Sequence, residues 1–356
     1  MSEIHNNNAI RGAGIHNRAS QPKLIDVTIS ENTASLDGGG MLNDASNPLV
    51  WMSLFAINQA DNGAGVYNED GSQPDFRDVQ FISNIAQASG GGMYNVDSQP
   101  TMIDVSLDEN SANGDGGGLY FDGGSGSLLN VIFIANYASW GGGIYHLSSD
   151  LSLTNVAFDS NTANYGAGIY ANNSAANLTN STFFGNAAAT LGGGVRNFQS
   201  TLIVDNSIFW KNTGGADSQI ANMSGTVAVS YSLIQGGCPS GSACSGVLLT
   251  SDPLFWQESY LDKWGNLVVG DLRLQPASPA IDCGNNTALP ADIYDRDYDG
   301  DIAELLPIDL GGRTRRVDIN TIPDLGNGIP PIVDLGAYEA EYLIYLPVLS
   351  SEQASP

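Results

Sequence analysis

Residues 76–95 read Phe76-Arg-Asp-Val-Gln-Phe-Ile-Ser-Asn-Ile-Ala-Gln-Ala-Ser-Gly-Gly-Gly-Met-Tyr-Asn95, and they contain two motifs that recur along the first 215 residues. One motif is a small-residue triplet that begins and ends with glycine and is followed by an apolar residue; the other is an apolar residue, usually Phe, three positions before Asn. The last glycine of the triplet advances by 25 to 27 residues at each step, and it stands at Gly14, Gly40, Gly65, Gly92, Gly118, Gly143, Gly168 and Gly194. The asparagines keep the same period at Asn32, Asn58, Asn84, Asn110, Asn136, Asn161, Asn186 and Asn212.

A repeat of this length is typical of a solenoid, in which each unit buries its apolar face against its neighbours. The apolar runs span only 4–6 residues, are rich in Val, Ile and Phe, and are bounded by Gly, Asn, Ser and Pro. Such runs indicate strands and corners, whereas helical repeats need longer windows of 3.6-residue periodicity. The sequence therefore predicts an all-β fold, a right-handed parallel β-helix of about nine coils of 25–27 residues.

The alternation of apolar residues locates the corners of a coil. Val79 and Phe81 share a face, and Phe76 joins them only if the alternation breaks at Asp78. Asp and Asn tolerate left-handed backbone, so they suit a bend. The same column, named here the Asp/Asn column, holds Asp26, Asp78, Asp104, Asn130, Asn155, Asn180 and Asn206. The glycine triplets and the Ser-x-Pro sequences predict two further corners, and the repeated Asn residues are expected to pair from coil to coil.

Composition limits the function. The chain has 356 residues, 43 of them Gly, and a formal net charge of −26, which disfavours nucleic acid and anionic lipid as partners. No stretch reaches the about 18–20 apolar residues that a transmembrane helix needs. We expect three parts: a parallel β-helix over 1–250, a capping, Asp-rich segment over 251–341, and an apolar strand with a polar tail over 342–356.

Cysteine usage favours an oxidising compartment. Cys238 and Cys244 flank a five-residue loop that a disulfide can close, and Cys283 is left over. Residues 1–18 contain no apolar signal-peptide core, so a leader is expected to have been removed or to lie upstream. The expected location is extracellular or on the cell surface.

The paired motifs resemble the repeats of polymorphic outer membrane proteins and of other bacterial β-helix surface proteins. The later segments Asp271-Leu-Arg-Leu-Gln-Pro-Ala-Ser-Pro-Ala-Ile-Asp-Cys-Gly284 and Val333-Asp-Leu-Gly-Ala-Tyr-Glu339 resemble secreted proteins of the choice-of-anchor Q type. This resemblance implies a secreted or surface protein in which the Ser-Pro-Ala-Ile-Asp module terminates the solenoid. It carries over no catalytic residue.

The strongest chemical motif resembles a calcium loop. Carboxylates alternate around a glycine turn at Asp295, Asp297, Asp299, Asp301 and Glu304. The match is imperfect, because the twelfth position is Leu306 and Glu304 has to serve in its place. A structural Ca²⁺ site and a solvated acidic loop are both open.

Two columns suggest ligand binding or catalysis. The first is an aromatic stripe that is expected to face outward and consists of Tyr67, Tyr94, Tyr120, Tyr145 and Tyr170. Such a stripe can stack on sugar rings or on a partner protein; alternatively, the tyrosines simply cover the face of the sheet. In the second, Asp78 and Asp104 lie on adjacent coils about 5 Å apart, beside Arg77. Asn fills the same column in later coils, so a bend residue explains it equally, and no catalytic residue is assigned.

The apolar stretch near the C-terminus is expected to add a strand to a neighbouring copy or to fold back on its own solenoid; its residues are Tyr342, Leu343, Ile344, Tyr345, Leu346, Val348 and Leu349. The first hypothesis is therefore a non-catalytic structural or adhesive surface protein, assembling end to end into filaments. The alternatives are a carbohydrate-active enzyme, either a polysaccharide lyase or a glycosidase, and a glycan-binding module. A concave cleft with at least two carboxylates and a basic residue would contradict a purely structural role.

Overall fold

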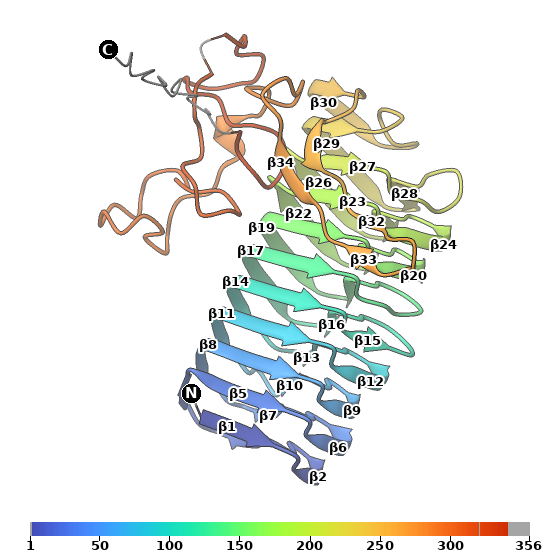
Figure 1. The fold of residues 1–356 in the computed structure, drawn as a ribbon, viewed down its shortest axis with the longest axis vertical. Coiled ribbons are helices and arrows are strands. Elements are labelled where there is room, and N and C mark those ends of the chain that lie inside the picture. The colour runs from blue at the N-terminus through green and yellow to red at the C-terminus, as the bar shows by residue number, and fades with distance from the viewer. Residues whose placement is uncertain (1, 320, 341–356) are drawn as a thin grey trace, which may run out of the picture.

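The computed structural model describes residues 2–319 and 321–340, and in this part of the chain a parallel β-helix of about nine coils runs from the N-terminus to residue 249 (Figure 1). The predicted all-β solenoid is confirmed. Most coils contribute to three faces, with one or two strands on the broadest of them, and strands pair with their equivalents in the neighbouring coils. The single helical element in the described chain is the short 3₁₀ helix η1 (Asn286–Ala288).

The broad sheet has 14 strands, and its longest members span 8–10 residues. Its strands are β1 (Ser2–His5), β4 (Lys23–Ile25), β5 (Val27–Ser30), β8 (Leu49–Ala56), β11 (Asp75–Ile82), β14 (Thr101–Asp108), β17 (Ser125–Ile134), β19 (Asp150–Asp159), β22 (Ala175–Thr179), β23 (Thr182–Phe184), β26 (Thr201–Asp205), β27 (Ile208–Trp210), β29 (Thr226–Ile234) and β30 (Ala243–Leu249). All pairings in this sheet are parallel, as in β11 with β8 and β14.

Two narrower faces close each coil. The alanine sheet consists of β2 (Asn8–Arg11), β6 (Thr33–Asp37), β9 (Gln59–Asn62), β12 (Ile85–Ser89) and β15 (Ser111–Ala112), and the pair β20 (Thr162–Tyr165) and β24 (Ala187–Leu191) continues this face. The tyrosine sheet has nine strands: β3 (Ile15–Arg18), β7 (Met41–Asp44), β10 (Val66–Glu69), β13 (Met93–Val96), β16 (Leu119–Asp122), β18 (Ile144–Leu147), β21 (Ile169–Asn172), β25 (Val195–Phe198) and β28 (Ile220–Met223).

Each coil turns at residues with left-handed backbone. In the coil that contains β11–β13 these are Asp78 (φ 52°), Ser83 (φ 52°), Gly90 (φ 69°) and Asp97 (φ 46°). The predicted bend is confirmed throughout the Asp/Asn column, where φ lies between 50° and 55°. The corner at Ser83 was not predicted, because its column holds unrelated residues: Glu31, Ile57, Ser83, Glu109, Ala135, Ser160, Gly185 and Lys211.

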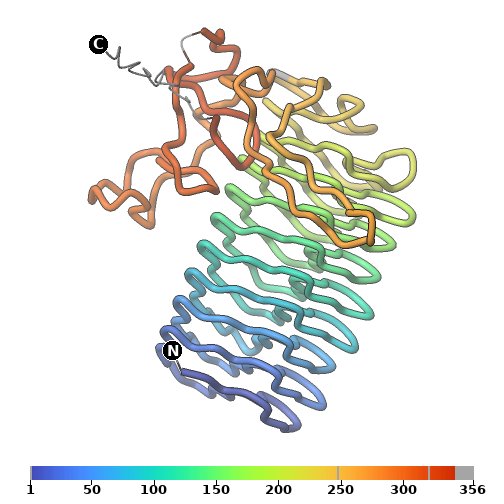
Figure 2. Tube along the Cα trace, in the orientation of Figure 1, coloured from blue at the N-terminus to red at the C-terminus, as the bar shows by residue number. Residues whose placement is uncertain are grey.

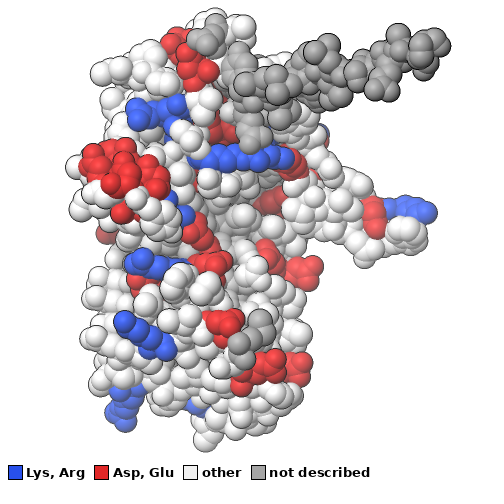
Figure 3. Space-filling model, turned by 60° about the vertical axis from the view of Figure 1, so that its left-hand side comes forward, with Lys and Arg blue, Asp and Glu red and all other residues white. Residues whose placement is uncertain are grey.

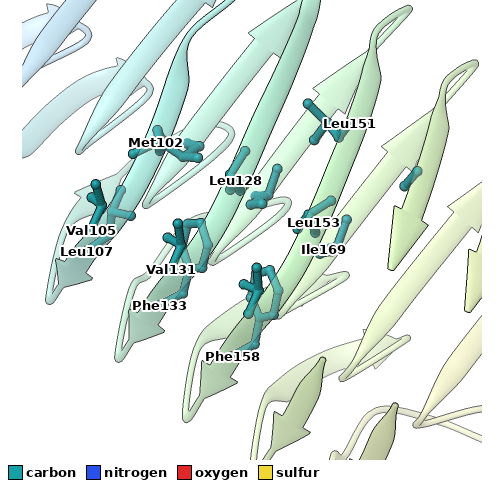
Figure 4. Packing of buried hydrophobic residues seen from close by; sticks show 14 of the residues in the cluster. Met102, Val105, Leu107, Leu128, Val131, Phe133, Leu151, Leu153, Phe158 and Ile169 are labelled. Carbon is teal, nitrogen blue, oxygen red and sulfur yellow. The ribbon is translucent and has the colours of Figure 1, made fainter. Parts of the chain in front are cut away.

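The core is a set of apolar ladders along the solenoid axis. Phe158 stacks on Phe133 and Phe183 with ring centroids 4.6 and 4.5 Å apart, and Figure 4 shows Phe133 and Phe158 in register on adjacent coils. The third glycine of each triplet permits close approach of the next coil, since a Cβ on Gly92 would lie 2.6 Å from the carbonyl oxygen of Gly118. Coil spacing therefore depends on these glycines as well as on the apolar core.

The predicted asparagine ladder is confirmed. Asn84 Nδ2 donates to Asn110 Oδ1 at 2.9 Å and to the carbonyl oxygen of Phe55 at 2.9 Å. The backbone N–H of Asn84 also donates to Asn110 Oδ1, at 3.1 Å. The equivalent contacts run from Asn7 to Asn212, so the side-chain amides of this ladder are paired from coil to coil.

A second asparagine ladder, on the inner side of the tyrosine sheet, was not predicted. It links Asn17, Asn43, Asn68 and Asn95 through side-chain hydrogen bonds of 2.7–2.8 Å. The column then holds Phe121, His146 and Ala171 before Asn197 and Asn222 resume it. His146 is fully buried, and its Nε2 has no hydrogen-bond partner among the described residues.

The C-terminal segment, residues 251–340, leaves the solenoid and packs on the outside of the broad sheet (Figures 1 and 2). Its strands are β31 (Phe255–Gln257), β32 (Tyr260–Leu261), β33 (Leu267–Val268) and β34 (Asp271–Leu274), paired antiparallel as β31–β34 and β32–β33. Side chains of the Asp/Asn column hold it: Asn155 Nδ2 donates to the carbonyl oxygen of Ile308 at 3.0 Å, and Asn206 Oδ1 accepts from the N–H of Asn285 at 2.7 Å. The column thus bends the chain and also docks the C-terminal segment.

Candidate functional site: a cleft on the broad sheet

A cleft of about 450 Å³ lies where residues 294–298 of the C-terminal segment pass over the outer face of β8, β11 and β14. It contains four carboxylates, two guanidinium groups and three aromatic side chains. Its lining residues are Leu49, Trp51, Asp75, Arg77, Asp78, Ile103, Asp104, Tyr294, Asp295, Arg296 and Tyr298. The condition set for contradicting a purely structural role is therefore met.

The parallel register explains why Trp51, Arg77 and Ile103 line one wall. These three residues are direct partners on adjacent strands, and their neighbours Val50 and Phe76 point into the core. Trp51 keeps 45% of its surface exposed. The solenoid thus presents an accessible indole beside charged groups.

The left-handed corner places two carboxylates at the floor of the cleft. Asp104 Oδ1 accepts hydrogen bonds from Arg296 Nη2 at 2.7 Å and from Asn130 Nδ2 at 3.1 Å. For Asp78, by contrast, the described residues supply no side-chain donor within hydrogen-bonding distance, and its side chain is exposed. Asp104 is therefore held in position, whereas Asp78 is available to an incoming ligand.

Arg77 is held by a carboxylate and an aromatic ring. Its Nη2 donates to Asp75 Oδ2 at 2.8 Å, and its guanidinium lies 5.9 Å from the ring centroid of Tyr294. The hydrogen bond to Asp75 raises the pKa of Arg77, and partial burial opposes that rise. These contacts fix one wall of the cleft across two parts of the chain that are more than 200 residues apart.

Two shallower hollows continue the cleft into a trough. One, of about 550 Å³, shares Asp75 and extends along polar side chains to Asp150 and Asn177. The other, of about 300 Å³, shares Asp78 and extends to Asp26 and Met52. Acidic side chains outnumber basic ones along this trough. Figure 3 shows acidic and basic patches interspersed on one face of the molecule. This surface suits an extended ligand that carries little or no negative charge.

The tyrosine column forms a stack instead of an open stripe. Successive ring centroids from Tyr67 to Tyr170 lie 4.3–5.3 Å apart, so the ring faces contact one another. Tyr120, Tyr145 and Tyr170 are buried, and Arg196 covers Tyr170 at 4.8 Å from its centroid. Since a sugar needs a free ring face for stacking, this geometry favours the alternative in which the tyrosines cover the sheet.

The Asp-rich loop brings carboxylates together in two overlapping groups. Asp295, Asp297 and Asp299 form one, and Asp292, Asp297 and Glu304 form the other; within each, one ligand atom per residue lies within 4.8 Å of the others. Asp301, which was also predicted as a ligand, belongs to neither group. The N–H of Gly300 donates to Asp295 Oδ1 at 3.0 Å and helps to close the loop.

Asp292 was missed by the sequence motif. Its side chain is 1% exposed, and its Oδ1 has no hydrogen-bond partner in the described chain. Burial, followed by the charges of Asp297, Asp299, Asp301 and Asp292, raises the pKa of Glu304. The loop therefore holds uncompensated negative charge of the kind that a hard cation neutralises.

The remaining predicted residues are placed as follows. Cys238 and Cys244 form a disulfide, and Cys283 is a buried free thiol. Residues 342–349, predicted to carry assembly, lie outside the described residues. No helix of the described chain combines the length and the apolar character needed to cross a membrane.

The fold and the trough define a β-solenoid repeat protein with a lateral cleft. No model of a known protein family matches the chain, and no curated protein is significantly similar to it. The resemblance to polymorphic outer membrane proteins and to choice-of-anchor Q proteins therefore has no support beyond the solenoid itself.

Proposed function

We propose that this chain is an adhesive surface protein that binds a glycan of neutral or weakly cationic character in the trough on the broad sheet. The observation that carries the proposal is the cleft itself, with an exposed indole beside fixed carboxylates and guanidinium groups. Aromatic faces contact the apolar side of a sugar ring, and charged groups accept or donate hydrogen bonds to its hydroxyls.

Charge selects among glycans. The trough contains Asp26, Asp75, Asp78, Asp104, Asp150 and Asp295 against two arginines, and both arginines pair with carboxylates. A polyanion such as pectate would be repelled, which also argues against nucleic acid. A polymer fits better than a monosaccharide, because three hollows adjoin through Asp75 and Asp78.

Affinity electrophoresis tests this proposal. The full chain is run in native gels that contain xylan, galactomannan, β-glucan, chitosan or polygalacturonate. We expect at least one neutral or cationic polymer to retard the protein, no retardation by polygalacturonate, and about tenfold weaker retardation of Trp51→Ala.

Trp256→Ala is the matched control, because Trp256 is 47% exposed and lies outside the trough. This variant should behave as the wild type does. Equal retardation of Trp51→Ala and wild type, or no retardation in any neutral or cationic polymer, would show that the trough does not bind a glycan.

A calcium ion in the Asp-rich loop is part of the proposal. Asp295 belongs both to the acidic group and to the lining of the cleft, so an ion there would fix one wall. The buried, unpartnered Asp292 Oδ1 supports this role. Chelation should weaken glycan retardation, and calcium should restore it; retardation that is indifferent to chelator would remove the metal from the site.

A second candidate is glycoside hydrolysis. Asp78 and Asp104 occupy equivalent positions on adjacent coils, whose spacing of about 4.8 Å is close to that of the two carboxylates in retaining glycosidases. Incubation with a polymer that retards the protein, followed by reducing-end analysis, tests this candidate. Product that disappears in Asp78→Asn would establish hydrolysis; intact polymer would leave binding as the function.

The disulfide Cys238–Cys244 supports an extracellular location, because such bonds persist in oxidising compartments. Filament formation is a separate proposal, since the residues predicted to carry it lie outside the described chain. Electron microscopy of the purified protein at high concentration tests it, and monodisperse particles would count against it.

A further inference from the structure

Asp282 has a fully buried carboxylate that no donor satisfies. Its side chain is 0% exposed, and neither carboxylate oxygen has a hydrogen-bond partner in the described chain. Its backbone, by contrast, is well bonded: the N–H donates to Asp334 Oδ1 at 2.8 Å, and the carbonyl oxygen accepts from Leu325 and Gly326 at 2.9 and 3.0 Å. The carboxylate is thus held in place but lacks compensation, which is costly for a buried charge.

Neighbouring buried acids show that poor packing is not the cause. Asp334 Oδ2 accepts from the N–H of Ala340 at 2.7 Å, and Glu339 Oε1 accepts from the N–H groups of Arg316 and Val317 at 2.9 and 3.0 Å. Glu339 also faces Arg315 at 3.4 Å. Asp334 and Glu339 are therefore satisfied by main-chain donors, whereas neither oxygen of the adjacent Asp282 carboxylate has a hydrogen-bond partner in the described chain.

Two further carboxylates face Asp282. One oxygen of Asp318 and one of Asp324 lie with an oxygen of Asp282 so that all three are within 4.8 Å of one another. Two oxygens bound to one Ca²⁺ at about 2.3–2.6 Å lie at most about 5 Å apart, so a single ion can reach all three. Asp318 and Asp324 are exposed, which gives an ion access from solvent.

The backbone is built to keep these groups together. A Cβ on Gly326 would lie 1.9 Å from the carbonyl oxygen of Gly284, so only glycine permits this approach of the two stretches. The N–H of Asn327 donates to the carbonyl oxygen of Gly284 at 2.8 Å. Asp324 is therefore tied to Asp282 by main-chain contacts that do not depend on the carboxylates themselves.

We propose that Asp282, Asp318 and Asp324 bind a Ca²⁺ ion at a second site, separate from the Asp-rich loop. The ion neutralises the buried Asp282 carboxylate and links residues 282–284 to residues 318–326. Burial, followed by the charges of Asp324, Glu339 and Asp318, raises the pKa of Asp282 to about 7. The N–H of Ile319 offsets part of that rise, although it does not meet the geometry of a hydrogen bond to the carboxylate. This inference does not depend on glycan binding.

Calorimetric titration of the metal-free full chain with Ca²⁺ tests the proposal. The variant Asp318→Asn/Asp324→Asn changes two exposed side chains and should fold as the wild type does. We expect it to lose one equivalent of Ca²⁺ or to bind that equivalent about tenfold more weakly. The matched control Asp297→Asn/Asp299→Asn, in the Asp-rich loop, should keep this equivalent.

Hydrogen exchange adds a second readout. Calcium should slow exchange of the amides at 282–284 and 324–327 in the wild type and in the control, but not in Asp318→Asn/Asp324→Asn. Unchanged stoichiometry and affinity in that variant would overturn the proposal. Exchange at these amides that responds to pH but not to Ca²⁺ would also overturn it, because a proton would then neutralise Asp282.

Discussion

The solenoid and the C-terminal segment satisfy buried polar groups in opposite ways. In the solenoid, one asparagine per coil repeats the same set of hydrogen bonds, as Asn84 and Asn110 illustrate. In the C-terminal segment most of the buried polar residues are charged and occur once, as Arg315 and Glu339 do. Stability is therefore distributed among equivalent coils in one region and concentrated in a few contacts in the other.

The cleft forms where these two regions meet. Trp51, Asp78 and Asp104 lie on the repeated strands of the solenoid, whereas Tyr294 and Arg296 lie in the C-terminal segment, which has no repeat. A repeated surface offers the same groups in every coil, whereas the added segment makes one position along the solenoid different from the others. This difference explains why a single cleft can arise on a repetitive scaffold.

The largest expected effect is a loss of stability in the C-terminal segment that leaves the solenoid unchanged. Arg315 is 0% exposed and bonds Asn155 Oδ1 at 2.7 Å and the carbonyl oxygen of Ala337 at 2.9 Å. Arg315→Met leaves Glu339 without its cation, so opening of the C-terminal segment should become easier by about 3–5 kcal/mol. Native-state hydrogen exchange measures this change, and Arg18→Met, at an exposed pair, is the control. Equal loss of protection in the first coils would contradict the separation.

Breaking the asparagine ladder should lower the stability of the solenoid by a smaller amount. Asn110→Ala removes the acceptor of two donors on Asn84 and also removes the side-chain donor to the carbonyl oxygen of Phe81. We expect a loss of about 2–4 kcal/mol in the free energy of unfolding, measured by urea denaturation. Asn113→Ala, on the exposed side of the same coil, should cost far less. Similar losses in the two variants would mean that the ladder contributes little.

The buried histidine makes the solenoid sensitive to acid. Burial lowers the pKa of His146 from 6.5 to about 4, so the unfolded chain binds more protons between these values. Stability should therefore fall as pH drops from 6.5 to 4, by about 3 kcal/mol at the lower end. His146→Ala places in this coil the residue that Ala171 provides in the next, and it should remove this part of the pH dependence, as followed by thermal melting. His16→Ala, at an exposed position, should leave it unchanged.

The smallest effect concerns the wall of the cleft. Arg296 and Asp104 form a partly exposed pair, with 15% and 40% of their side chains accessible. Arg296→Gln should loosen residues 294–298 by about 1 kcal/mol or less, without a change in melting temperature. Limited proteolysis of the loop measures this change. A large drop in melting temperature would mean that the pair supports the solenoid itself.

Periodicity explains which features could be predicted. The Asp/Asn column, the glycine triplets and the ladder from Asn32 to Asn212 appear in the sequence because stacking favours the same residue type at most levels, although Met52 takes the bend position in one coil. The corner at Ser83 was missed because many residue types tolerate it there. The second ladder was missed because Phe121, His146 and Ala171 interrupt it.

The sequence allowed only some of the residues of the candidate site to be predicted. Asp78, Asp104 and Arg77 were recognised as neighbours on adjacent coils, but Trp51, Tyr294, Arg296 and Tyr298 were not. The Asp-rich loop was identified as a cation motif, whereas Asp292 lies outside its spacing. Trp51 stands in a column that also holds Ile25, Arg77, Ile103 and Leu129, and an indole at that position is a further sequence signal for the cleft.

The sequence by itself determined the β-solenoid, its coil length and most of its corners, because each coil repeats the same steric and hydrogen-bonding demands. Only the tertiary structure decided where the C-terminal segment docks, and with it the cleft and the Asp282 cluster. Arg296 and Asp104 are 192 residues apart in the sequence. Because Arg296 does not belong to the repeat, no periodic pattern in the sequence could reveal this contact. Such contacts depend on the three-dimensional path of one aperiodic segment.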